Sequence, residues 1–190
     1  MSQNLIAECV HSKPKKIPLL TSGKVLPLVM HEWELTCLDF FATNKKLVEA
    51  DWVEAILPGL RDLHAHDWIV TYCKCLITIL FTNVMKEIRK EFLPDSWDDD
   101  LHSCLLNSQL WASDNFMTWV NNLHYQNLTL LNTDYHLSDD ALCQLLETLL
   151  DPDLCTHCKN HKVKETVDAA TDSTGNKSAK IGLMTWIAEV

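Results

Sequence analysis

Residues with metal-binding chemistry gather in one segment, CTHCKNH at residues 155–161. Its candidate ligands are Cys155, Cys158 and His161, with His157 as an alternative. Structural zinc takes four tetrahedral ligands, usually as two separated pairs of Cys or His. No second pair follows this segment, and its spacing differs from that of a zinc knuckle. We therefore predict a helix with two half-buried thiols and exposed imidazoles, and neither a metal nor another cofactor.

Three other groups have reactive residue types without the matching spacing. Cys73 and Cys75 are too close for a redox dithiol motif and face different sides of a helix. The sequence places no nucleophile or orienting acid beside His64 and His66. The acidic run at residues 98–100 fits the first turn of a capped helix, where the helix dipole favours acids. We predict no catalytic residue and do not expect an enzyme.

Composition allows a packed core. Of the 190 residues, 47% are hydrophobic and 22% are charged, and the 4 glycines leave little room for a Gly-rich phosphate loop. No run reaches the roughly 18 apolar residues that span a bilayer. The first residues lack the apolar core of a signal peptide. We expect a soluble, cytoplasmic protein with no membrane partner.

Charge and cysteine content restrict the partners and the compartment. The net charge is −10, and the one basic cluster is KPKK at residues 13–16, so we expect little direct nucleic-acid binding. The 8 cysteines accompany no secretion signal. We interpret most of them as reduced, buried, small apolar residues, with Cys37 and Cys104 on apolar helix faces.

Apolar residues recur at helical spacing along most of the chain, after an extended arm at residues 1–23. A break at Pro94-Asp95-Ser96 divides the helices into two groups. Ser138 is predicted to cap a later helix, and residues 168–180 to form a flexible loop. The predicted helices span residues 26–44, 50–57, 62–73, 82–93, a segment after 96, 113–131, a segment after 138, a segment after 151 and 181–190.

The tryptophans are predicted to pack in the core, with one exception. Trp111 lies between two helices, so it is a candidate for an interface, and packing within the loop is an equal alternative. The residues expected on apolar helix stripes are Trp33, Trp52, Trp68, Trp97 and Trp119.

Several segments, in order, resemble the capsid region of fungal gypsy-type retrotransposon Gag polyproteins. The segments are SGKVLPLVMHEWELTCLDFF (22–41), ILPGLRDLHAHDWI (56–69), FTNVMKEIRKEFLPDSWDDDL (81–101), residues 109–123, HLSDDALCQLLE (136–147) and MTWIAEV (184–190). The resemblance covers roughly residues 20–190, and the neuronal Arc capsid-like protein is similar in layout. Each motif is weak alone, and their order carries the likeness.

The resemblance implies an all-α fold of two small helical lobes, as in retroviral and retrotransposon capsid proteins. Residues 24–94 would be the N-terminal lobe and residues 95–190 the C-terminal lobe. The family's major homology region has a Gln followed by an aromatic helix. Leu110 stands where that region usually has a Gly. The matching residues are Gln109, Phe116, Trp119 and Leu123.

The resemblance implies a structural capsid protein that self-associates into a multimeric shell. One alternative is a domesticated, Gag-derived binding module that acts on a partner protein as a monomer or small oligomer. A second alternative is a zinc- or thiol-dependent enzyme, which stoichiometric metal in the purified protein would support. The oligomeric state separates the first two hypotheses.

Overall fold

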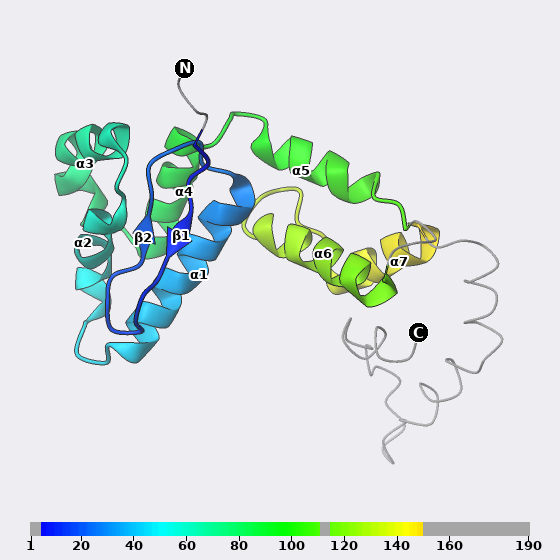
Figure 1. Ribbon diagram of the computed structural model, residues 1–190, viewed down its shortest axis with the longest axis horizontal. Coiled ribbons are helices and arrows are strands. Elements are labelled where there is room, and N and C mark those ends of the chain that lie inside the picture. Colours follow the sequence, from blue (N-terminus) through cyan, green and yellow to red (C-terminus); the bar gives the residue numbers. More distant parts are fainter. Residues whose placement is uncertain (1–4, 111–114, 150–190) are drawn as a thin grey trace, which may run out of the picture. The chain divides into compact units, whose positions relative to one another are not determined.

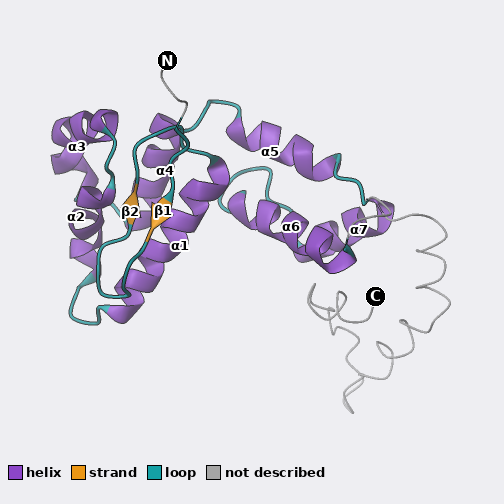
Figure 2. Cartoon of the chain, viewed as in Figure 1, coloured by secondary structure: helices purple, strands orange, loops and turns teal. Residues whose placement is uncertain are grey.

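The computed structural model describes residues 5–110 and 115–149 (Figure 1). The chain divides into two compact units, Met1–Trp97 and Asp98–Val190, which we call the first and the second unit. The division falls just after the Pro94-Asp95-Ser96 segment. Seven α-helices and a single two-stranded sheet make up the regular structure of the described residues (Figure 2). This confirms the predicted all-α class.

The first unit contains α1 to α4 and two short 3-10 helices. Their bounds are α1 Pro27–Thr43, Glu49–Asp51 (3-10), α2 Trp52–Ile56, Leu57–Gly59 (3-10), α3 Leu63–Leu76 and α4 Phe81–Phe92. Pro27 occupies the first turn of α1, where its missing N–H costs nothing. Asp62 caps α3 by accepting a hydrogen bond from the His64 N–H at 2.8 Å. Pro94 follows the end of α4 and prevents its continuation.

The segment predicted as an extended arm, residues 1–23, is instead part of the first unit where it is described. Strands β1 (Cys9–Val10) and β2 (Leu19–Leu20) pair antiparallel, with Cys9 opposite Leu20. Ala7 and Leu20 are buried in the core of the unit. Because burial of these apolar residues removes them from water, the hairpin is held against the helices rather than free in solvent.

Two glycines allow close backbone approach, one within the N-terminal segment and one between the hairpin and the rest of the unit. Gly23 has a φ of +136°, and a Cβ there would lie 2.4 Å from the Leu5 carbonyl oxygen. A Cβ on Gly59 would lie 2.3 Å from the Pro18 carbonyl oxygen. A side chain at position 23 would separate residues 5–7 from residues 23–24, and one at position 59 would push the hairpin away from the helices.

One apolar face of α1 is buried throughout. It consists of Met30, Trp33, Cys37, Phe40 and Phe41. The Trp33 indole N–H donates to the Pro18 carbonyl oxygen at 3.3 Å, which ties the hairpin to α1. The Phe41 ring stacks on the ring of Trp52 at a centroid distance of 4.4 Å. These contacts join α1, α2 and the hairpin around one core.

The second unit contains α5 (Trp97–Leu106, starting on the last residue of the first unit), α6 (Phe116–Thr129) and α7 (Asp139–Leu149). Asn115 caps α6, and Ser138 caps α7 as predicted, by accepting the Ala141 N–H at 3.3 Å. The buried Asn127 side chain donates to the Leu137 carbonyl at 2.9 Å and accepts its N–H at 2.8 Å. This pair of bonds fixes α6 to the turn that precedes α7.

A second core lies within these helices. Its buried residues are Leu105, Trp119, Val120, Leu123, Leu142 and Leu146. Three predictions lie outside the described residues: the helix after residue 151, the loop at residues 168–180 and the helix at residues 181–190.

Candidate functional site

Helix α3 covers the first unit with one face and leaves the opposite face in solvent. Ala65, Trp68 and Leu76 point inward and are buried. At 100° per residue, positions 63, 70 and 77 lie together on the outer side. There Leu63 is 83% exposed and Val70 is 70% exposed. We call Leu63, Val70 and Ile77 the outer stripe of α3.

Exposed apolar side chains continue from α3 into the turn before α4. The large apolar residues exposed within residues 63–80 are Leu63, Val70, Tyr72, Ile77, Ile79 and Leu80. Half of the Tyr72 side chain is exposed, although the neighbouring Trp68 ring is buried. Scattered apolar residues on a surface are ordinary, whereas such a concentration is typical of an interaction surface.

Two hollows flank α3. One, of about 540 Å³, is lined by residues of the 3-10 helix Leu57–Gly59 and by one side of α3, including Leu63, Ile69 and Cys73. The other, of about 370 Å³, has Trp68, Tyr72 and Ile79 in its wall, with three charged residues of α4. The lining of both is mostly apolar.

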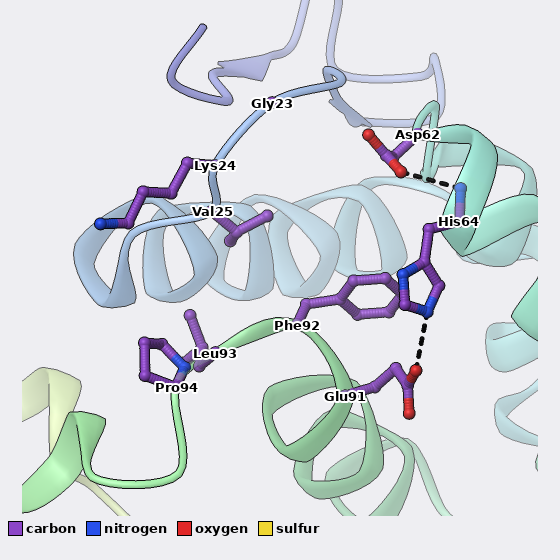
Figure 3. Close-up of a pocket in the computed structure, with 9 residues that line it drawn as sticks. All are labelled: Gly23, Lys24, Val25, Asp62, His64, Glu91, Phe92, Leu93 and Pro94. Carbon is purple, nitrogen blue, oxygen red and sulfur yellow. Dashed lines mark hydrogen bonds and ion pairs between the residues drawn. The ribbon is translucent and has the colours of Figure 1, made fainter. Parts of the chain in front are cut away.

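A third hollow, of about 350 Å³, is lined by His64 and Glu91, whose side chains contact each other (Figure 3). The His64 Nε2 lies 2.8 Å from the Glu91 Oε1, and the Phe92 ring meets the imidazole edge-on. The pair joins α3 to α4. The sequence did not reveal Glu91 as the acid beside His64, because 27 residues separate the two.

In the His64–Glu91 pair, the carboxylate could orient the imidazole as it does for a catalytic base. The hollow, however, has no Ser, Thr or Cys nucleophile beside the imidazole. The remaining lining residues are Gly23, Lys24, Val25, Asp62, Leu93 and Pro94, and none of them is a Ser, Thr or Cys. The imidazole side chain is 63% exposed, so water screens the pair. The arrangement links α3 to α4.

A buried charge cluster lies inside the first unit and was missed at the sequence level. The Arg89 guanidinium donates to a Glu34 carboxylate oxygen, and the His31 Nδ1 lies 3.9 Å from the same oxygen. Burial lowers the pKa of His31, and the charge of Arg89 lowers it further. Burial raises the pKa of Glu34, and Arg89 opposes that rise. Helical spacing placed Arg89 beside the apolar stripe of α4, next to the buried Ile88, which could have indicated that Arg89 is buried but not that Glu34 is its partner.

The residues expected to match a major homology region fall in the second unit. Trp119 is buried and its indole N–H donates to the Ser108 Oγ at 3.0 Å. Phe116 lies 6.1 Å from Trp119 between ring centroids, and Leu123 is buried in the same core. Gln109, in contrast, is exposed. The candidate interface residue Trp111 lies outside the described residues.

The acidic run 98–100 occupies the first turn of α5, as predicted. Tyr135 lies near it, and the negative charge of Asp99, together with desolvation and the charge of Asp98, raises the pKa of the phenol. Within the described ranges, no group of three or more His, Cys, Asp or Glu is arranged to hold a metal ion.

The cysteines only partly follow the prediction of burial. Cys37 is buried and its burial raises the pKa of the thiol. Cys104 is exposed, contrary to prediction, because the buried position of that turn belongs to Leu105. Cys75 is exposed and Cys73 is half-buried, so the two face different sides of α3 as expected. The 155–161 segment lies outside the described residues.

Comparison with protein-family models, with curated proteins and with solved structures found no match to this chain. In the part of the chain that the structure describes, no helix combines the length and apolar character that a membrane span requires.

Proposed function

We propose that this protein is a structural protein that self-associates in the cytoplasm into a multimeric shell, as Gag capsid proteins do. The proposal rests on one surface, formed by the outer side of α3 and the turn that follows it. There, within residues 63–80, six large apolar side chains are exposed. Covering apolar surface is worth about 25 cal/mol per Å², so this surface favours contact with another molecule.

An assembly of many copies needs contacts that are individually weak. A stable two-protein interface buries about 1,600 Å² in total, more than one short helix supplies. A shell uses many small contacts at once, and repeated two-fold or head-to-tail contacts generate closed or open assemblies. A limited apolar surface on a compact helical unit suits that use.

The proposal is tested by the size of the protein as its concentration rises. Light scattering from about 1 to 500 μM, with negative-stain microscopy of the most concentrated sample, should give masses that grow with concentration and regular particles. A constant monomer mass over the whole series would contradict it.

A second candidate function is that of a binding module for a partner protein. The observation that favours it is the hollow of about 540 Å³ beside α3, whose wall is mostly apolar with Glu54, Arg61 and His66 at its edge. Such a hollow fits an apolar peptide side chain with polar neighbours. A chain that stays monomeric, yet loses affinity for a selected peptide when Ile69 is changed to Lys, would favour this function.

A further inference from the structure

The outer stripe of α3 has a regular repeat. Leu63, Val70 and Ile77 are spaced by seven residues, so they follow one line along the helix, about 21 Å long at 1.5 Å per residue. Val70 lies at its centre, with one larger apolar residue about 10 Å away on each side. Reversing the helix end to end about Val70 therefore leaves the apolar pattern nearly unchanged.

The charges beside this stripe are also related by reversal. Asp67 and Lys74 are exposed and lie on the same flank of the stripe, at about 40° and 20° from Leu63 on the helical wheel. Asp67 lies three residues before Val70 and Lys74 four residues after it, so the two charges are nearly equidistant from the centre of the stripe. The other flank carries His66 and Cys73 and so has no Asp, Glu, Lys or Arg.

These two patterns indicate that the partner of the α3 surface is a second copy of this chain. When two antiparallel helices are related by a two-fold axis between them, the same flank of each faces the other, and a residue before the centre meets one after it. Asp67 of one copy then lies opposite Lys74 of the second copy, and the reverse holds as well. Val70 meets Val70, and Leu63 lies opposite Ile77.

We propose that α3 is a two-fold interface at which the outer stripes of two copies of this chain pack antiparallel, with Asp67 and Lys74 setting the register. The proposal rests on the self-association proposed above and names its contact. The apolar stripe supplies the attraction, and the two charge pairs favour this alignment over a parallel one. Since a pair of 14-residue helices buries little area, the isolated contact is weak and leaves the dimer in equilibrium with the monomer.

A charge-exchange experiment on the full chain tests the register. Asp67→Lys makes both flank positions positive in each copy, and Lys74→Asp makes both negative. Each variant alone should associate roughly tenfold more weakly than the wild type, because two opposite-charge pairs become like-charge pairs. An equimolar mixture of the two variants should regain wild-type association, since each positive flank then meets a negative one. Sedimentation velocity measures all four samples.

Net charge alone predicts a different result. Asp67→Lys brings the chain from −10 toward neutrality, so general repulsion between copies would fall and association would strengthen. Weaker association of this variant therefore supports the local contact.

A second pair of variants tests the apolar part of the contact. Val70→Asp should abolish the dimer, whereas Val48→Asp, at an exposed apolar position outside α3, should leave it intact.

Three outcomes overturn the interface. If the wild type self-associates and both charge variants do so equally well, the contact lies elsewhere and the proposed function stands. If the variants are weak and their mixture stays weak, the antiparallel register is wrong. A wild type that remains monomeric at every concentration overturns both the interface and the proposed function. Helical spectra and melting curves of each variant show whether a loss comes from unfolding.

Discussion

Residues 1–97 carry 11 Lys and Arg against 12 Asp and Glu, whereas residues 98–158 contain no Lys or Arg at all. The second unit as a whole has 5 Lys and Arg against 14 Asp and Glu, so it carries most of the net charge of −10. The first unit is nearly neutral and exposes the α3 surface. If copies associate as proposed, attraction between them comes mainly from the α3 surface of the first unit and like-charge repulsion mainly from the second unit.

The two units also differ in what they bury. Among the described residues, the buried polar side chains of the first unit are His31 and Arg89, whereas those of the second unit are the neutral Asn127 and Thr129. In the part of each unit that the structure describes, the core of the first unit contains twenty buried apolar residues and that of the second unit six. The first unit, in addition, must keep its internal charges paired.

The largest expected effect is the loss of Trp119. Trp119→Ala removes the largest side chain of a six-residue core and should cost about 3–5 kcal/mol. That is a large share of the stability of a small unit, so the second unit should unfold while the first stays helical. Circular dichroism combined with limited proteolysis distinguishes the units. Ser108→Ala, which removes only the hydrogen-bond partner of the indole, should cost about 1 kcal/mol. Equal melting of Trp119→Ala and the wild type would show that this core does not hold the unit.

Breaking the buried ion pair should have the next largest effect, confined to the first unit. Arg89→Met leaves the Glu34 carboxylate buried without its cation and should cost about 3 kcal/mol. The double variant Arg89→Met/Glu34→Leu should recover most of that loss, because no buried charge remains. Urea unfolding of the single and double variants measures the coupling. A double variant as unstable as the single one would mean that packing, rather than charge, explains the loss.

The pH dependence of the first unit tests His31. Its pKa in the folded protein lies below its ordinary value of 6.5. The unfolded chain therefore takes up the proton first, and stability should fall as the pH drops below about 6.5. The raised pKa of Glu34 has the opposite effect on stability at lower pH. The folded protein takes up this proton first, so stability rises as the pH falls toward 4.5, the ordinary pKa of the carboxyl. Urea unfolding at pH 7.5, 6.5 and 5.5 measures the free energy of unfolding. This free energy should fall with pH in the wild type, and His31→Gln should lack that dependence. Identical slopes would exclude His31 as the cause.

The smallest expected effect comes from separating the units. Each has its own core, so residues 1–97 and 98–190, expressed separately, should both give helical spectra and cooperative melts. Residues 1–97 should melt within about 4 °C of the corresponding transition in the full chain, a shift that corresponds to less than about 1 kcal/mol for this size. Two unfolded fragments would contradict the division into independent units.

Much of the helical framework was predictable because apolar residues recur at helical spacing. The bounds of α1 and the buried face from Met30 to Phe41 follow directly from that pattern. The hairpin was not predictable, since strands of two residues are too short to show alternation. The His64–Glu91 and Glu34–Arg89 pairs join residues 27 and 55 positions apart, and a single sequence gives no signal for such pairing.

The candidate surface on α3 was hidden for a related reason. Trp68 was recognised as an inward residue, but Leu63, Val70 and Ile77 differ from core residues only in being uncovered. Tertiary packing decides which side of an apolar helix is covered by a neighbour. The sequence pattern does not contain that information.

The central claim, self-association driven by apolar contact against like-charge repulsion, is tested most directly by the salt dependence of assembly. Raising salt from 0.1 to 1 M shortens the reach of charge repulsion from about 10 to about 3 Å, while apolar contacts persist or strengthen. Sedimentation velocity of the full chain at one fixed concentration should therefore show larger species at 1 M NaCl than at 0.1 M, with or without RNA. Particles that form only with RNA and dissociate as salt rises would contradict the account.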